Sequence, residues 1–113
     1  MKTEKCFSFL WADRRSLKRV LLLILLGTRG GPARLKILAR LRARPMNAHQ
    51  LSKELDIDYK TARHHLEVLE KNGLVERLGE GYGAVYTLSD MLQKNWDLVA
   101  EAARYLGYDS LDN

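Results

Sequence analysis

Residues 47–75 read NAHQLSKELDIDYKTARHHLEVLEKNGLV, a stretch that predicts two short helices separated by a tight turn. Asn47 and Gln50 make a capping box in its Asn/Gln form, so the first helix begins directly after Asn47. Asp58 caps the second helix, which is predicted over residues 59–72 and ends at an Asn-Gly pair. The apolar positions at helical spacing are Ala48, Leu51 and Leu55 in the first helix, and Ala62, Leu66 and Leu69 in the second. Each helix therefore has one side to bury against the rest of the chain.

A third helix is predicted before this pair. Pro32 fits its first turn and Pro45 ends it, which places the helix at residues 33–44. Its apolar stripe is Leu35, Leu38, Ala39 and Leu41. Its basic residues are Arg34, Lys36, Arg40, Arg42 and Arg44. We expect most of these basic side chains to be solvated on the outer face of the helix.

A β-hairpin and a last helix are predicted after the pair. Residues 74–78 and 84–88 are two short runs that flank a loop over residues 79–83 containing three glycines, which predicts a β-hairpin. Ser89 caps a helix over residues 90–106. Its apolar stripe is Leu92, Trp96, Val99, Ala103 and Leu106. So narrow a stripe is typical of a seam between two helices.

The N-terminal part contains the apolar run VLLLILL at residues 20–26, in a helix that begins after Asp13 and ends at Gly27. Spanning a bilayer takes about 20 such residues, and Arg19 and Arg29 prevent any extension of the run. No cleavage site of small residues follows it, so a signal peptide is not expected. We expect a cytoplasmic protein in which the run is buried, and since the run is apolar all round, a second subunit would cover part of it.

Three short helices, a hairpin with a glycine-rich tip and a seam helix follow one another in the order of a winged helix-turn-helix. From the helix at 33–44 to Leu88 the chain resembles the ArsR-type and related archaeal winged-helix transcription regulators, most specifically in HHLEVLEKNGLV at residues 64–75. The resemblance implies a mainly α fold with a small β-hairpin, to which the apolar pattern adds extra helices at both ends. It also implies a DNA-binding transcription regulator whose partner is double-stranded DNA.

In such a fold the helix at 59–72 is the recognition helix, whose N-terminal side chains meet base edges and phosphates. Its basic side chains come first and its carboxylates, Glu67 and Glu70, come later, which directs the front of the helix toward DNA. The candidate DNA-binding residues on this helix are Tyr59, Lys60, Thr61, Arg63 and His64. We assign Arg63 to a base or base-proximal contact and Lys60 to a phosphate.

Five further candidates lie outside the recognition helix. Asn47, His49 and Gln50 start the preceding helix, where they can hold a phosphate or, for Asn47 and Gln50, simply cap the helix. Arg77 and Tyr82 are candidates on the wing, although the carboxylate of Glu80 argues against a strongly basic tip. His65 lies beside Ala62 and Leu66 on the helical wheel, so we expect a packed, hydrogen-bonded histidine there.

A metal site is not expected. Many ArsR-type regulators sense metals through a Cys-x-Cys pair in the first helix of the motif, where this chain reads HQLSK at residues 49–53. His64 and His65 diverge by about 100° around the helix and cannot easily share one ion. Cys6 is the single cysteine, so it cannot form a disulfide within the chain.

Composition is that of one soluble domain, with 113 residues of which 46% are hydrophobic and 29% charged, so wholesale disorder is excluded. Charge is uneven: residues 1–44 carry a net charge of +10 and residues 45–113 a net charge of −5. From charge alone, this fits a polyanion or a membrane surface as partner and, equally well, a solvated basic face. No nucleophile lies beside a histidine in a catalytic motif, and we expect neither an enzyme nor a cofactor. Nothing in the sequence identifies a small-molecule effector.

These observations divide the chain into three segments. Residues 1–28 contain the apolar helix and are predicted to mediate dimerisation, residues 29–88 form the winged helix-turn-helix, and residues 89–113 form a C-terminal dimerisation helix. The favoured interpretation is a homodimeric, sequence-specific DNA-binding regulator. Two alternatives stay open at this point: a winged-helix adaptor that binds proteins, and a regulator held on a membrane surface by the apolar N-terminal helix.

Overall fold

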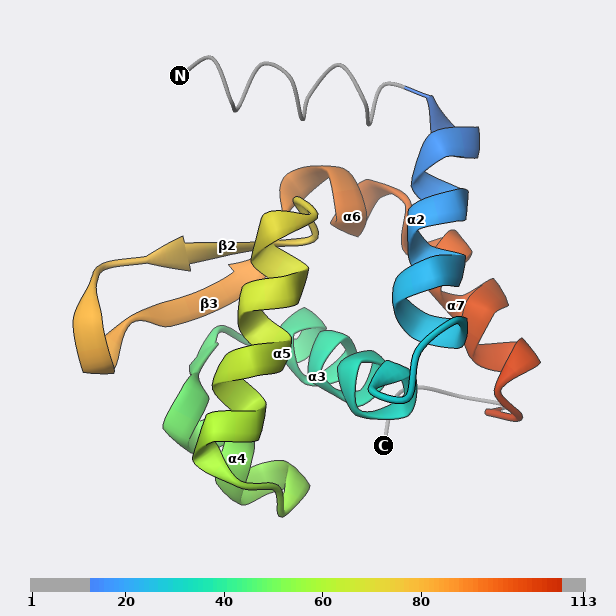
Figure 1. Cartoon of the computed structure of the whole chain (residues 1–113). Helices are drawn as coiled ribbons and strands as arrows, with labels where there is room; N and C mark the ends of the chain where they lie inside the picture. The colour runs from blue at the N-terminus through green and yellow to red at the C-terminus, as the bar shows by residue number, and fades with distance from the viewer. Residues whose placement is uncertain (1–12, 109–113) are drawn as a thin grey trace.

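Helix α3 lies at the centre of the computed structural model, which describes residues 13–108 (Figure 1). Helices α4 and α5 and a small sheet cover one side of α3, and helices α2 and α7 lie on the other side. The helices are α2 (Arg14–Leu26), α3 (Gly31–Ala43), α4 (Ala48–Leu55), α5 (Tyr59–Lys71), α6 (Asp90–Lys94) and α7 (Trp96–Tyr105), and the strands are β1 (Met46–Asn47), β2 (Val75–Leu78) and β3 (Val85–Leu88). The predicted fold class, mainly α with a β-hairpin after a helix-turn-helix, is confirmed.

Helix ends agree with the predicted caps. The side chain of Asp13 accepts from the backbone N–H of Arg15 at 3.0 Å, and helix α2 begins at the next residue, Arg14. Asn47 Oδ1 accepts from Gln50 N at 2.7 Å while Asn47 N donates to Gln50 Oε1 at 2.8 Å, which is a complete capping box. Helix α2 ends at Gly27 as predicted, and Gly27 has a φ of −88°, so the helix ends without a left-handed residue.

The sheet has three antiparallel strands in the order β1-β3-β2, one strand more than the predicted hairpin. The additional strand, β1, pairs Met46 with Tyr86 and Asn47 with Val85. Along β3 the side chains alternate, and Tyr86 and Leu88 are the buried ones. The sheet thus joins the start of α4 to the wing.

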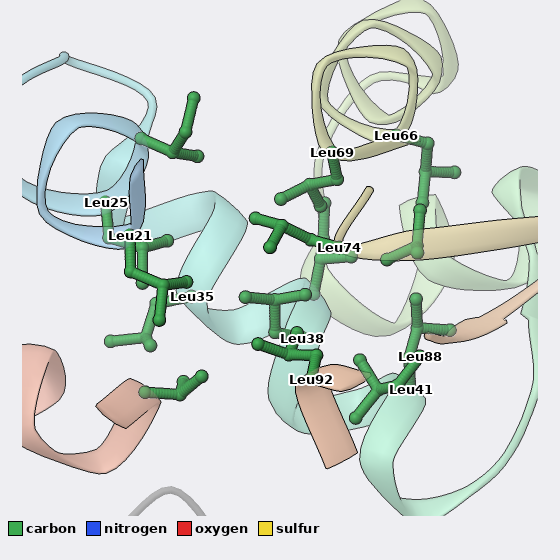
Figure 2. Packing of buried hydrophobic residues seen from close by; sticks show 14 of the residues in the cluster. Leu21, Leu25, Leu35, Leu38, Leu41, Leu66, Leu69, Leu74, Leu88 and Leu92 are labelled. Carbon is green, nitrogen blue, oxygen red and sulfur yellow. The ribbon is translucent and has the colours of Figure 1, made fainter. Parts of the chain in front are cut away.

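The core is built mainly from leucines contributed by nearly every helix and by the sheet (Figure 2). The labelled side chains are Leu21, Leu25, Leu35, Leu38, Leu41, Leu66, Leu69, Leu74, Leu88 and Leu92. In α3 the buried set also includes Ile37, whereas Ala39 of the predicted stripe is only half-buried. One apolar stripe was predicted for this helix. Because other elements pack on two sides of α3, it buries more of its surface than that stripe.

The last predicted helix, at residues 90–106, is not continuous. It breaks at Asn95 into α6 and α7, because the Asn95 amide donates to the carbonyl of Met91 at 2.8 Å and competes with the backbone ladder. The stripe residues Val99 and Ala103 are buried within this same chain, where α7 packs against α2. The predicted seam therefore exists, and α2 is one side of it.

The described residues that pack on helix α2 cover one side of it. Leu17, Leu21 and Leu25 are buried, whereas Leu23 is 62% exposed. Ion pairs from Arg14 to Asp97 at 2.7 Å and from Lys18 to Glu101 at 3.1 Å tie its outer edges to α7.

The described helices include none that is long and apolar enough to cross a bilayer. Residues 1–12, with Cys6 and the first part of the segment 1–28 assigned to dimerisation, lie outside the described residues. The same is true of residues 109–113, which end the C-terminal segment.

Candidate nucleic-acid interface

Helix α5 is positioned by its cap and by its buried side. Asp58 Oδ2 accepts from the N–H of Lys60 at 3.0 Å, and Asp56 in the turn before it has a φ of +55°, which lets the chain reverse between α4 and α5. Ala62, Leu66 and Leu69 are fully buried beneath the helix. Leucine packing therefore fixes which side of α5 faces outward.

Three of the predicted residues form the outward face of the N-terminal half of α5. Lys60, Thr61 and His64 are all exposed. Within the described chain, the side chains of Lys60 and Thr61 make no hydrogen bond or ion pair. A cation, a hydroxyl and an imidazole are thus available to a ligand on one face of one helix.

Arg63 is less free than the sequence suggested. It is half-buried, with its Nη1 donating to the Tyr59 hydroxyl at 3.3 Å and its Nη2 lying 3.5 Å from Glu67 Oε2. Its Nε is shielded from solvent and has no hydrogen-bond partner in the described residues. Its side chain lies along the helix toward Tyr59, because the hydroxyl one turn earlier offers an acceptor.

Tyr59 also meets the wing and the start of α4. Its ring centroid is 5.4 Å from that of Tyr82 and 6.4 Å from that of His49. These three rings come from three separate elements, and Figure 1 shows the hairpin beside α5. The sequence predicted each residue separately as a DNA contact and missed that they lie together.

The two candidates with capping chemistry, Asn47 and Gln50, have their side chains engaged in the capping box. His49 is exposed beside them. On the wing, Arg77 Nε lies 3.5 Å from Glu70 Oε2, so Arg77 faces the second half of α5 and lies away from the tip. Tyr82, by contrast, is at the tip and 70% exposed.

A buried polar cluster lies behind α5. Arg34 and His65 are each only 7% exposed, and Arg34 Nε donates to His65 Nδ1 at 3.1 Å. Arg34 Nη1 donates to the Ile24 carbonyl at 3.2 Å and to Thr28 Oγ1 at 2.9 Å. The prediction of a packed, hydrogen-bonded His65 is confirmed, whereas Arg34 departs from the solvated face expected for most basic residues of its helix.

Burial, followed by the nearby positive charges of Arg34 and His64, lowers the pKa of His65. With Nδ1 accepting from Arg34, the ring is the neutral tautomer that carries its proton on Nε2. The loop before α3 packs tightly here, since a Cβ at Gly30 would come within 2.6 Å of the His65 ring. The cluster links the end of α2, the start of α3 and the recognition helix.

Other basic side chains of α3 are also engaged. Arg40 and Arg44 each lie 3.1 Å from a carboxylate oxygen of Glu54 on α4, and the guanidinium of Arg42 lies 4.8 Å from the Trp96 ring centroid. Basic residues of α3 thus hold α4 and α7 in place. Among the described residues, no three His, Cys, Asp or Glu side chains lie together in a way that could hold a metal ion.

Comparison with known proteins identifies related chains. Residues 31–77 match the family model described as bacterial regulatory protein, arsR family. Reduced HlyU from Vibrio cholerae N16961 is 26% identical, with 84% of this chain and 95% of that chain covered and a TM-score of 0.59. A further structure of HlyU from the same organism is 27% identical, with 79% and 95% covered and a TM-score of 0.59.

A third solved structure is the transcriptional regulator HlyU from Vibrio vulnificus CMCP6, which is 24% identical, with 86% of this chain and 93% of that chain covered and a TM-score of 0.57. At that identity the likeness concerns the fold alone. A search of curated proteins finds no match. The fold is a winged helix-turn-helix, and its residues 31–77 are similar to the helix-turn-helix described by the model of the bacterial arsR family of regulatory proteins.

Proposed function

We propose that this protein is a transcription regulator that binds double-stranded DNA sequence-specifically as a homodimer. The observation that carries the proposal is the outward face of α5, where Lys60, Thr61 and His64 are exposed at the N-terminal half of the helix. A recognition helix meets base edges with this half. The match of residues 31–77 to a family of regulatory proteins supports the same function.

The roles divide by position along α5. Lys60 lies in the first turn and is suited to a phosphate, whereas Arg63 lies about one turn further along and is suited to a base edge. Thr61 and His64 are suited to either contact. Glu67 and Glu70 come later, so that end of the helix repels DNA.

The start of α4 and the wing add contacts on either side. The N-terminus of α4 carries Asn47, His49 and Gln50. The N–H groups of Asn47 and Gln50 are engaged in the capping box, so His49 is the member of this group that is suited to a phosphate. Arg77 and Tyr82 extend the surface along the hairpin. A DNA-binding regulator works where the DNA is, and we place it in the cytoplasm.

We assign dimerisation to the segments 1–28 and 89–113. On α2, Leu23 is 62% exposed, and Val20 and Leu26 beside it are partly exposed. These three side chains line one edge of the helix, and an apolar strip of this kind favours burial against a second copy.

Dimerisation is tested by Leu23→Glu, because deleting α2 would also remove the buried residues Leu17, Leu21 and Leu25. Sedimentation of the wild type should give the mass of two chains and that of Leu23→Glu the mass of one. Leu78→Glu, which alters a leucine 53% exposed on the wing, is the matched control and should stay dimeric. A wild-type monomer, or a Leu23→Glu dimer, would contradict the assignment.

DNA binding is tested by selecting bound duplexes from a random pool and measuring affinity against salt concentration. A common sequence should be enriched. Lys60→Ala should lower the slope of log affinity against log salt by about one. Lys71→Ala, which removes another exposed lysine at the other end of α5, should leave the slope unchanged. A pool without enrichment, or equal slopes for the two variants, would contradict the proposal.

A further inference from the structure

Tyr59 occupies a junction that direct DNA contact does not explain. Its ring lies against the ring of Tyr82 at the wing tip, with centroids 5.4 Å apart and planes inclined by 36°. Its hydroxyl accepts a hydrogen bond from Arg63 Nη1 at 3.3 Å. One half-buried side chain therefore touches the wing with its face and the proposed base-reading arginine with its oxygen.

The orientation of Arg63 depends on few contacts. Its Nε is shielded and has no partner in the described residues, so Tyr59 and Glu67 are the polar groups that hold the guanidinium. The contact with Glu67 is longer, at 3.5 Å, and the carboxylate is 54% exposed. The Tyr59 hydroxyl is thus the nearer and better sheltered of the two acceptors.

The wing tip is loosely surrounded except at this ring pair. A Cβ added at Gly79, Gly81 or Gly83 would meet no atom within 4 Å, so side chains leave the loop open at each of these positions. Gly79 and Gly81 have φ values of +86° and +74°, which suit the tight turn but supply no packing. The contact of Tyr82 with Tyr59 is therefore well placed to set where the tip lies relative to α5.

We propose that Tyr59 is a positioning residue, which sets the wing against α5 through its ring and presets the Arg63 guanidinium for base recognition through its hydroxyl. This inference rests on the proposed function. In this inference the Tyr59 hydroxyl acts on DNA binding through Arg63. The competing explanation is that Tyr59 contacts DNA directly. A guanidinium held in advance loses less conformational freedom on binding, which favours the correct site.

The test is a double-mutant cycle with Tyr59→Phe and Arg63→Ala, read out as the ratio of affinities for the selected site and for random DNA. Tyr59→Phe keeps the ring against Tyr82 and should lower this ratio about two- to tenfold with the salt slope unchanged. In the Arg63→Ala background the same substitution should have no further effect. If the two losses multiply, Tyr59 contacts DNA itself, and if Tyr59→Phe has no effect, the hydroxyl does not position Arg63; either result overturns the inference.

Two more measurements separate this inference from the proposed function. Without DNA, the Arg63 Nε proton should exchange slowly with water in the wild type and faster in Tyr59→Phe, and equal rates would overturn the inference whatever the protein binds. Tyr59→Leu removes the ring pair as well and should also weaken binding to random DNA, because the wing loses its position. Absence of specific binding in the wild type would instead defeat the proposed function.

Discussion

Replacing Arg34 with methionine keeps an unbranched aliphatic stem at this buried position and removes the guanidinium group. Three hydrogen bonds are lost: to His65 Nδ1 at 3.1 Å, to the Ile24 carbonyl at 3.2 Å and to Thr28 Oγ1 at 2.9 Å. Together they join α3 to the recognition helix and to the end of α2. We expect Arg34→Met to destabilise the whole fold.

The size of the loss in unfolding free energy follows from the hydrogen-bond acceptors that Arg34→Met leaves without a donor. His65 is 7% exposed and its Nδ1 is left unpaired, which costs about 1–3 kcal/mol. The Ile24 carbonyl still accepts from Thr28 Oγ1 at 3.1 Å and adds less. The guanidinium no longer has to be desolvated, which offsets part of the loss. The free energy of unfolding should fall by about 2 kcal/mol and the melting temperature by about 8 °C.

Urea unfolding followed by circular dichroism near neutral pH measures this loss. The midpoint should fall while the dependence on urea concentration stays the same, which marks a change in stability alone. Lys36→Met is the matched control, since Lys36 is exposed on the same helix and has no polar partner among the described residues. Its effect should stay within about 0.5 kcal/mol. An Arg34→Met variant as stable as this control would refute the reasoning.

Two further predictions concern the same part of the fold. Because burial, and then nearby positive charge, lowers the pKa of His65, the unfolded chain binds a proton that the folded chain excludes as the pH falls below about 6.5. Unfolding free energy should therefore decrease with falling pH by up to about 1.4 kcal/mol per unit, and His65→Asn should remove that part of the slope; identical slopes in urea titrations would contradict this. Gly31→Ala should destabilise severely, since its Cβ would lie 1.8 Å from the Leu25 carbonyl, whereas Gly83→Ala meets no atom within 4 Å and should be neutral. Equal melting temperatures for the two alanine variants would show that the contact between α2 and α3 is not as tight as described.

Helix starts were predictable because capping is local chemistry. Asp13, Asn47 and Asp58 each accept a hydrogen bond from a backbone N–H within three residues, and the sequence displays that pattern directly. The strand β1 was not predictable in this way, because its two residues become a strand only through pairing with β3 about forty residues later. The break at Asn95 was not predictable either, because it depends on the hydrogen bond that the Asn95 side-chain amide donates to the Met91 carbonyl.

The candidate site was predictable to a similar degree. Helical spacing correctly placed Lys60, Thr61 and His64 on the exposed face of α5. Burial of Arg34 could not be foreseen, because its acceptors come from the end of α2 and from α5, which meet only in the folded chain. The i, i+4 spacing of Arg63 and Glu67 was a visible signal for their ion pair, whereas the contact of Tyr59 with Tyr82 depends on the tertiary placement of the wing.

Whether α5 reads base sequence is decided by two affinities, for the selected duplex and for random DNA, measured at one salt concentration for the wild type and for Arg63→Ala. A good bidentate base contact discriminates about 5- to 150-fold. We expect Arg63→Ala to lower the ratio of the two affinities by a factor in that range. An unchanged ratio in a variant that folds as the wild type does would contradict this expectation.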